Sequence, residues 1–550
     1  MKKGALVYFA GISLLLITPD LCAQNVGVGI LAPAGKLHIK GSANVSQLII
    51  DANVTQSNTQ PILKFRNSSG TELLWMHSDT SQNTFLGLNA GRVNTFDGIG
   101  GGLSNSFIGS NAGYSNTTGA SNSAVGYKAL YANTTGSQNM ATGSNALEKN
   151  TTGSWNTACG SSALLLNTTG SNNTAVGAST LSINTTGFGN TAIGKNVMSN
   201  NVNGYNNTAV GLDALLNNTS GDNNTALGIF ALLNNTTGYF NTACGGSALG
   251  NNTTGFSNSA FGNASLASTT TGTLNCGFGN SSLSNNTTGS NNVGIGYNVL
   301  GLNSNGYENT SVGNFALYQN SNGFANTAIG KNALLSNSIG SGNTAIGYYA
   351  GQSHQNDANN TFLGTSTDSN NDGYNTSTAV GAFAYITASQ QVRIGNNVTS
   401  IGGPQNWTNT SDRRIKNDIR EDVHGLDFIS LLRPVTYTKS LKQEYAIVGI
   451  TPSMEISTDN PYEKIRYSGF IAQEVESAAR NIGYDFSGVD APKNEKDLYG
   501  LRYAEFVVPL VKAVQELNMQ NAQLNAEIEE LHMLIDQMSA RLKKIEESEQ

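Results

Sequence analysis

Charged side chains are scarce in this sequence, at 12% of 550 residues. They are also unevenly placed, because 17 of the 29 Lys and Arg and 24 of the 36 Asp and Glu lie in residues 411–550. The first 410 residues are therefore neutral overall and carry no cluster of basic residues. Since proteins bind nucleic acid through clustered Lys and Arg that neutralise phosphates, this distribution excludes nucleic acid as a partner.

Cysteine and long apolar runs are also sparse. The chain has 4 cysteines, and the three that follow residue 23 are an odd number that argues against a disulfide framework. A basic start, the apolar run Ala5–Ile17 and the small residue Ala23 predict a signal peptide over residues 1–23. No later apolar run reaches the roughly 20 residues that span a bilayer. We therefore expect an exported chain without a transmembrane segment, either secreted or held at the cell surface.

Glycine, by contrast, is abundant and periodic. Seventeen glycines from Gly109 to Gly381 follow one another at intervals of 17 residues. An Asn lies four residues before each of them up to Gly364, and a second Gly lies ten residues after each from Gly109 to Gly330. A fixed period of this length predicts a β-solenoid in which each unit is one coil, with turns at the glycines and short strands between them.

The repeat also predicts what each coil buries. Leu at one site and Ala-Val or Ala-Ile at another form two small apolar faces, and the regular Asn predicts a ladder of side-chain hydrogen bonds. At the usual strand spacing the stack rises on the order of 80 Å. Cys159 and Cys244 occupy the Val or Ile site before the glycine, which predicts small buried side chains. Paired carboxylates and His clusters are scarce in these repeats, so we expect no cofactor and no metal there.

Residues 104–396 resemble the head repeats of trimeric autotransporter adhesins, which also run as N-T-A-V-G units separated by a second glycine. The resemblance implies three parallel chains in a β-roll, a role in surface adhesion, and a host or environmental glycan as a possible ligand. Residues 24–103 are less regular, and their alternating apolar segments predict a β-rich cap or neck. Residues 397–410 are interpreted as a linker.

The composition changes abruptly after Pro404, where charged residues replace Asn and Gly. Four blocks follow in order, namely Ser411–Ile419, Leu432–Tyr437, Gly469–Val475 and Leu501–Tyr503. Together they resemble peptidase S74, the intramolecular chaperone of phage tail spikes and endosialidases. The resemblance implies a small α+β chaperone domain over residues 411–508.

The same resemblance implies a self-cleavage site. It assigns Ser411 as nucleophile and Lys416 as general base, with scission between Thr410 and Ser411. A lysine accepts a proton only where burial or neighbouring positive charge favours its neutral form, and Arg413 and Arg414 are close in sequence. Taken alone, Ser and Lys at this spacing are more typical of a solvated turn and a surface cation.

His424 and Asp427 form a rival pair that could act as base and orienting group. A single His near the start of a helix is, however, usually an ordinary surface residue. The dyad of Ser and Lys therefore remains the preferred interpretation.

Residues 509–549 carry apolar residues at alternating steps of four and three over about five heptads, which predicts a coiled coil. Val or Ile at several a positions, Leu at most d positions and Asn521 favour two strands by the simplest rule. Both resemblances imply three, and we adopt a homotrimer because shaft and C-terminal domain would then share one axis.

These features predict an exported fibrous adhesin, mainly β, with a C-terminal chaperone that drives trimerisation and then cleaves itself once per chain. One alternative is an uncleaved adhesin in which the C-terminal domain serves only as a trimerisation clamp. Another is a solenoid whose Thr-Thr-Gly and Asn-Thr rows form a flat face that binds glycan or ice.

Overall fold

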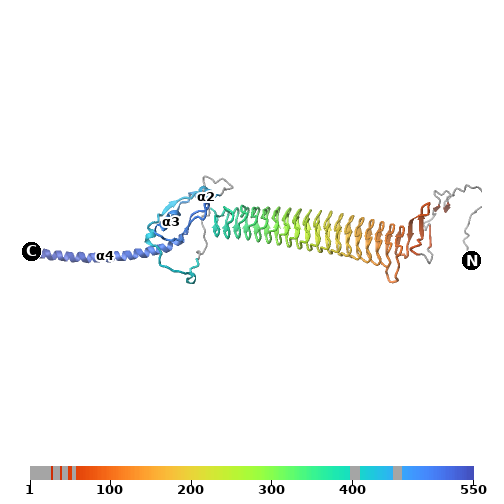
Figure 1. Cartoon of the computed structure of the whole chain (residues 1–550), viewed down its shortest axis with the longest axis horizontal. Coiled ribbons are helices and arrows are strands. Elements are labelled where there is room, and N and C mark those ends of the chain that lie inside the picture. Colours follow the sequence, from red (N-terminus) through yellow and green to blue (C-terminus); the bar gives the residue numbers. More distant parts are fainter. Residues whose placement is uncertain are drawn as a thin grey trace, which may run out of the picture.

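The structure is a computed structural model that describes residues 26–28, 37–39, 48–51, 57–396, 409–449 and 461–549. The predicted signal peptide and most of the predicted linker lie outside these residues. The molecule is elongated (Figure 1): a stack of thin coils leads into a smaller mixed domain, from which one long helix projects.

Strands at the N-terminal side cover the first coil of the stack. β1 (Val26–Val28) and β2 (Leu37–Ile39) form a separate parallel pair. β3 (Leu63–Arg66) and β4 (Glu72–His77) form an antiparallel hairpin, and β4 also pairs antiparallel with β5 (Thr84–Leu86). This hairpin covers the edge of the main ladder at β5. The unpaired backbone N–H and C=O groups of an uncovered edge strand could otherwise pair with a strand of another chain.

From β5 onward each coil contributes one short parallel strand. Each strand pairs in register with the strand of the next coil, as in the pairs Thr174 with Thr191 and Ala175 with Ala192. β22 (Asp368–Ser369) and β24 (Tyr385–Ile386) form a second short parallel pair near the end of the stack. The strands of the main ladder after β5 are β6 (Ser106–Ile108), β7 (Ser123–Val125), β8 (Met140–Thr142), β9 (Thr157–Cys159), β10 (Thr174–Val176), β11 (Thr191–Ile193), β12 (Thr208–Val210), β13 (Thr225–Leu227), β14 (Thr242–Cys244), β15 (Ser259–Phe261), β16 (Cys276–Phe278), β17 (Val293–Ile295), β18 (Thr310–Val312), β19 (Thr327–Ile329), β20 (Thr344–Ile346), β21 (Thr361–Leu363), β23 (Thr378–Val380) and β25 (Val392–Ile394).

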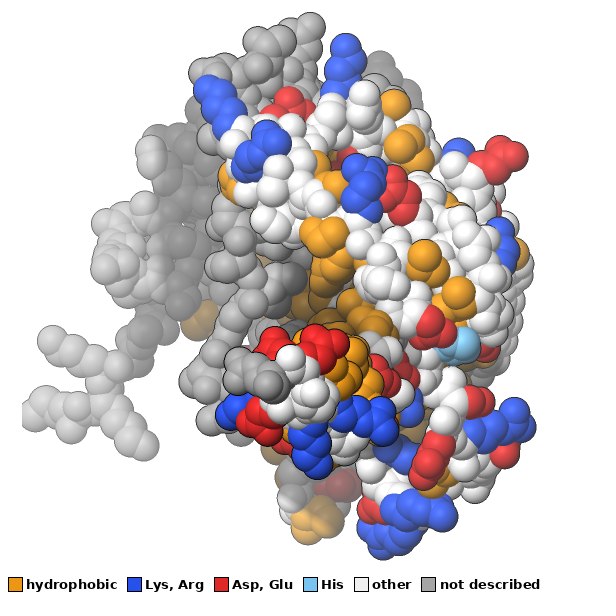
Figure 2. All heavy atoms as spheres, turned by 90° about the vertical axis from the view of Figure 1, so that its left-hand side faces the viewer, with side chains coloured by type: hydrophobic (Ala, Val, Ile, Leu, Met, Phe, Trp, Pro, Cys, Tyr) orange, Lys and Arg blue, Asp and Glu red, His pale blue; other side chains and the backbone are white. Residues whose placement is uncertain are grey.

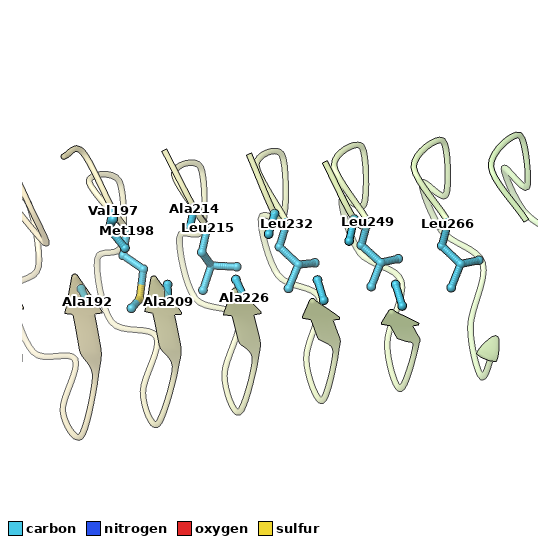
Figure 3. Close-up of a cluster of buried hydrophobic side chains, with 14 of the residues drawn as sticks. Ala192, Val197, Met198, Ala209, Ala214, Leu215, Ala226, Leu232, Leu249 and Leu266 are labelled. Atoms are coloured by element: carbon cyan, nitrogen blue, oxygen red, sulfur yellow. The ribbon is translucent and has the colours of Figure 1, made fainter. Parts of the chain in front are cut away.

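The apolar core of each coil is a contact between a strand and the opposite turn. The middle residue of each strand, usually Ala, points inward and meets the Leu of the turn, as Figure 3 shows for Ala226 and the adjacent Leu residues. Leu215 and Leu232 are fully buried, with φ of 53° and 51°. The expectation of strands at both apolar sites is therefore wrong at the Leu site. Its left-handed conformation, rare for Leu, is held by burial and by hydrogen bonds such as Leu215 N–H to the Ala231 carbonyl at 2.9 Å.

The prediction that Cys159 and Cys244 are buried is also wrong. Cys159 is exposed and Cys244 is half-buried. Side chains alternate along a strand, so the inward position of the middle Ala places the third residue on the outer face.

The periodic glycines allow the coils to approach closely. Gly211 has a φ of 132°, and a Cβ placed there would lie 2.6 Å from the carbonyl oxygen of Gly228 in the next coil. Almost every coil repeats this contact between successive glycines. Only glycine combines this backbone conformation with this proximity.

Two ladders of buried asparagines run along the shaft, where the sequence predicted one. In the first, Asn105 to Asn360, the amide of Asn173 donates to Asn156 Oδ1 at 3.2 Å and to the Gly187 carbonyl at 2.9 Å. In the second, Asn116 to Asn337, the amide of Asn167 donates to Asn150 Oδ1 at 2.8 Å. Buried amides need partners, and each coil supplies them to the next.

The second ladder is interrupted once between its ends, at Thr269. The hydroxyl of Thr269 is buried without a hydrogen-bond partner among the described residues, and so is Asn252 Oδ1 in the preceding coil. The amide of Asn286 in the following coil reaches only the Gly289 carbonyl, at 2.9 Å. One coil thus leaves polar atoms unsatisfied inside the shaft.

The C-terminal domain combines short helices with two small antiparallel sheets. β26 pairs with β27 and β28 pairs with β29. Phe428, Val475, Phe486 and Phe506 form its core. Its elements are the 3-10 turn η1 (Arg413–Ile415), α1 (Leu426–Ile429), β26 (Val435–Tyr437), α2 (Leu441–Val448), the 3-10 turn η2 (Pro461–Lys464), β27 (Tyr467–Gly469), α3 (Ala472–Asn481), β28 (Val489–Asp490), β29 (Gly500–Leu501), the 3-10 turn η3 (Tyr503–Phe506) and α4 (Val507–Ser548).

α4 leaves the domain as an isolated helix (Figure 1). Its predicted heptad residues are exposed, with Val514 at 63% and Ile535 at 56%. Within the described part of the chain, no helix is apolar and long enough to span a bilayer.

We predict that Thr269→Asn stabilises the shaft. The new amide can donate to Asn252 Oδ1, and its oxygen can accept from Asn286, so the free energy of unfolding rises by about 1–3 kcal/mol. Urea unfolding of the full chain, followed by circular dichroism, measures the change. Thr271→Asn is the matched control, because position 271 is exposed and the equivalent position already carries Asn203 in another coil. If both variants change the free energy of unfolding equally, the missing asparagine at position 269 does not limit the stability of the shaft.

Gly211→Ala should destabilise the shaft by about 2–5 kcal/mol, because the methyl group meets the Gly228 backbone and the φ is strained. Gly250→Ala is its control, since equivalent positions carry Leu233 and Ala267. The same urea experiment compares them. Unchanged unfolding of the Gly211 variant would refute the close-approach argument.

Candidate functional site

The predicted dyad is assembled by one 3-10 turn. Asp412 precedes η1, and its carboxylate accepts the backbone N–H of Arg414 at 2.9 Å, which starts the turn. The turn brings Lys416 back towards Ser411, and Lys416 Nζ donates a hydrogen bond to Ser411 Oγ at 2.7 Å. Nucleophile and proposed base are therefore within the distance that proton transfer requires.

The sequence placed Arg413 and Arg414 near Lys416, but in the structure the two arginines have different partners. The guanidinium of Arg414 pairs with Asp412 at 2.6 Å, and this hydrogen bond lowers the pKa of the Asp412 carboxyl. Arg413 donates to the Lys416 carbonyl at 3.3 Å. The charge of Arg414 is thus largely compensated, and Arg413 is the residue whose positive charge contacts the Lys416 segment.

Burial does not support the dyad within a single chain. Thr410, Ser411 and Lys416 are all exposed. The amine of Lys416 is therefore open to water, whereas a lysine that acts as a base needs burial or neighbouring positive charge. A covering surface has to come from elsewhere before Lys416 can act as a base.

His424 and Asp427, the rival pair, contact each other, but among the described residues neither has a hydrogen bond to Ser411. His424 Nδ1 lies 2.6 Å from Asp427 Oδ2, and this contact lowers the pKa of Asp427. The pair lines an open hollow of about 630 Å³ between α1 and α4. Glu516, which also lines it, accepts the Leu426 N–H at 2.7 Å and so ties α1 to α4. The described side-chain hydrogen bond of Ser411 is to Lys416.

A further group of polar residues lies where the second asparagine ladder ends. His354 takes the ladder position, and its Nδ1 is 2.9 Å from Ser369 Oγ, which also donates to Asp357 at 2.7 Å. Burial alone would lower the pKa of His354, but Asp368, Asp357 and Asp372 outweigh it and raise this pKa.

Burial also raises the pKa of Asp357. Ser369 is 3% exposed, so no substrate reaches this serine. The cluster therefore continues the buried polar interior of the shaft beyond Asn337. Among the described residues, no group of His, Cys, Asp and Glu is arranged to hold a metal.

The end of the shaft contacts the C-terminal domain through polar groups that sequence reasoning missed. Asp497 accepts a hydrogen bond from the Thr387 hydroxyl at 2.5 Å, and Asn494 donates to the Thr387 carbonyl at 2.9 Å. Asn370 donates to the carbonyls of Val448 and Lys496, both at 3.0 Å. These residues come from distant parts of the chain, so no local sequence pattern predicts that they are in contact.

The C-terminal end carries most of the charge. Figure 2, which looks onto this end along the long axis, shows basic and acidic side chains mixed over the surface. This agrees with the concentration of charged residues in residues 411–550.

Residues 411–484 match the family model of peptidase S74, described as the chaperone of endosialidase. The match begins at Ser411, includes the first three of the four blocks and confirms the resemblance to this family. No curated protein matches the chain. A β-solenoid shaft followed by a chaperone domain of this type fits a tail-fibre-like protein.

Proposed function

We propose that this protein is an exported, tail-fibre-like adhesin that assembles as a homotrimer and whose C-terminal domain is an intramolecular chaperone that cleaves the chain before Ser411. The observation that carries the proposal is the hydrogen bond from Lys416 to Ser411 at the first residue of the matched segment. Export and adhesion rest on the predicted signal peptide and on the resemblance of the repeats.

The cleavage chemistry follows from the position of Ser411. Its Oγ attacks the carbonyl carbon of Thr410, Lys416 accepts the hydroxyl proton, and the amide nitrogen leaves protonated as the amino group of Ser411. The resulting ester between Thr410 and Ser411 is hydrolysed by water. Each chain then ends in a Thr410 carboxylate, and the reaction occurs once.

Exposure of the dyad couples this reaction to assembly. A neighbouring chain that covers Lys416 would remove water from its amine and favour the neutral form. Cleavage would then follow trimerisation and not precede it. The exposed apolar row of α4 supports association, because a coiled coil of three helices would bury it.

A chaperone at the end of the shaft addresses the main difficulty of its folding. Successive coils are nearly identical, so two chains can align one or more coils out of register with similar contacts. A C-terminal clamp fixes the starting point of all three chains and raises their local concentration.

The first threonine of each Thr-Thr-Gly unit is poorly suited to bind ice or glycan. This threonine donates to the next coil, as Thr134 does to the Thr151 carbonyl at 3.1 Å and Thr151 to the Thr168 carbonyl at 3.0 Å. These hydroxyls are therefore already engaged within the shaft.

We predict that intact-mass analysis of the purified wild type detects scission between Thr410 and Ser411. Ser411→Ala removes the nucleophile, and Lys416→Arg keeps a cation that cannot act as a base, so both variants should stay whole. His424→Ala is the control and should still cleave. If the Lys416 variant is still cleaved and the His424 variant is not, the general base is His424. If every protein stays whole yet trimeric, the domain is a clamp without chemistry.

A chain that ends at Thr410 should misfold or aggregate on expression, because its shafts lack the clamp. The full chain with Ser411→Ala is the control, since it keeps the domain but cannot be cut. Light scattering after size exclusion compares their masses. Soluble trimers of the truncated chain, with the same unfolding midpoint as the cleaved shaft, would refute the chaperone role.

A further inference from the structure

One outward row of the shaft is apolar at every position but one. It consists of the third residues of the strands, and we call it the outer row. Ile193 and Ile346 in this row are 41% and 39% exposed. The members are Ile108, Val125, Thr142, Cys159, Val176, Ile193, Val210, Leu227, Cys244, Phe261, Phe278, Ile295, Val312, Ile329, Ile346, Leu363 and Val380.

Other outward positions behave differently. The position directly after each periodic glycine is occupied by residues as different as Tyr127, Ala178, Lys195 and Asn280. The outer row has one hydroxyl residue, Thr142, and no charged one.

The fold of a single coil does not require this composition. Inside the coil, Ala packs on Leu (Figure 3), and the outer row lies on the opposite face of the strand. Thr142 shows that a hydroxyl residue is accommodated. Apolar residues that recur at an exposed position over a long surface mark a contact surface.

The size of the row suits a stable interface. The outer row, from β6 to β23, rises roughly 77 Å at the usual strand spacing. A strip about 10 Å wide over this length covers on the order of 770 Å², close to the roughly 800 Å² that each partner of a stable complex buries.

The shape and the lack of charge of the outer row indicate which partner binds it. The partner must be straight, uncharged where it touches, and as long as the shaft, and a second copy of this chain has all three properties. Rotational symmetry brings identical residues together, so a charged row would repel itself. Both outward positions of every main-ladder strand from β5 to β23 are uncharged.

The exposed row of α4 leads to the same partner. α4 runs along the long axis of the molecule, as the shaft does (Figure 1). One rotation axis parallel to both can therefore bury the apolar residues of helix and shaft in the same assembly.

We propose that the outer row is the face through which the shafts of assembled chains pack, parallel and in register. This inference rests on the proposed homotrimer and specifies which of its faces is buried. It places equivalent residues of different chains next to one another, including Cys159, which is exposed in the single chain.

Cys159 provides the test. In the full chain with Cys22→Ser, Cys244→Ser and Cys276→Ser, it is the single remaining thiol. After oxidation with copper phenanthroline, a non-reducing gel should show covalent dimers containing up to two of every three chains. Before oxidation, its alkylation should be at least tenfold slower in the assembly than in the urea-unfolded chain.

The matched control carries Cys159→Ser and Ala178→Cys in the same background. Position 178 is exposed one coil further along but lies outside the outer row, so this thiol should alkylate quickly and form no dimer. Cross-linking at position 178 and none at Cys159, or none at either, would overturn the inference. Fast alkylation of Cys159 in a trimer would leave the row open to solvent and to another ligand, which also overturns it.

The native mass separates this result from the proposed function. A monomer in light scattering would contradict the homotrimer itself, whereas a trimer without the Cys159 cross-link would contradict only the assigned face.

A pair of substitutions adds a second readout. Ile193→Asp with Leu227→Asp places like charges of all copies together, and the shaft's unfolding midpoint should fall. Ala178→Asp with Leu212→Asp makes the same change at exposed positions two coils apart and should leave the midpoint unchanged. Equal midpoints for both pairs would contradict a buried outer row.

Discussion

The hydrogen bond between equivalent asparagines of successive coils is the interaction on which the shaft depends. A typical coil of 17 residues buries two Ala and one Leu, too little apolar surface to fold alone. The interior is therefore largely polar, and each buried amide is satisfied only when the next coil is in place, as with Asn156 and Asn173. Stability is then a property of neighbouring coils and not of any one of them, and it favours long, unbroken stacks.

This dependence explains which positions can vary. The glycine beside the strand must remain, because the next coil's backbone occupies the space of a side chain at Gly211. The inward Ala, the buried Leu and the two asparagines are fixed by the same contacts. The outward positions do not make these contacts, and residues as different as Tyr, Lys, Asn and Ser occur there. An outward row that nevertheless stays apolar is under a different constraint, which a single chain does not contain.

The period revealed the coil, its parallel strands and an asparagine ladder, because a fixed spacing has one simple physical cause. It misplaced Cys159, since a three-residue strand with an inward Ala turns its third residue outward, and periodicity alone does not say which residue points in. It also took the Leu site for a strand, because left-handed backbone at Leu contradicts local preference and is imposed by stacking. Ser411 and Lys416 were found through the family blocks, whereas the contact of Asp497 with Thr387 joins residues 110 apart, and no pattern reveals it.

The exposed dyad and the polar contact between shaft and domain together suggest an order of events. Asp497 can bond to Thr387 only when the coil next to the domain is folded, so this contact fixes the C-terminal end of the shaft against the domain. Lys416 is exposed in the single chain, so the proposed cleavage would require a neighbouring chain to cover it. The proposed scission would then break the covalent link to the clamp, while the asparagine ladders would continue to hold the coils. A separated shaft could not easily refold without its clamp, and the assembly would persist for kinetic reasons as well as for its contacts.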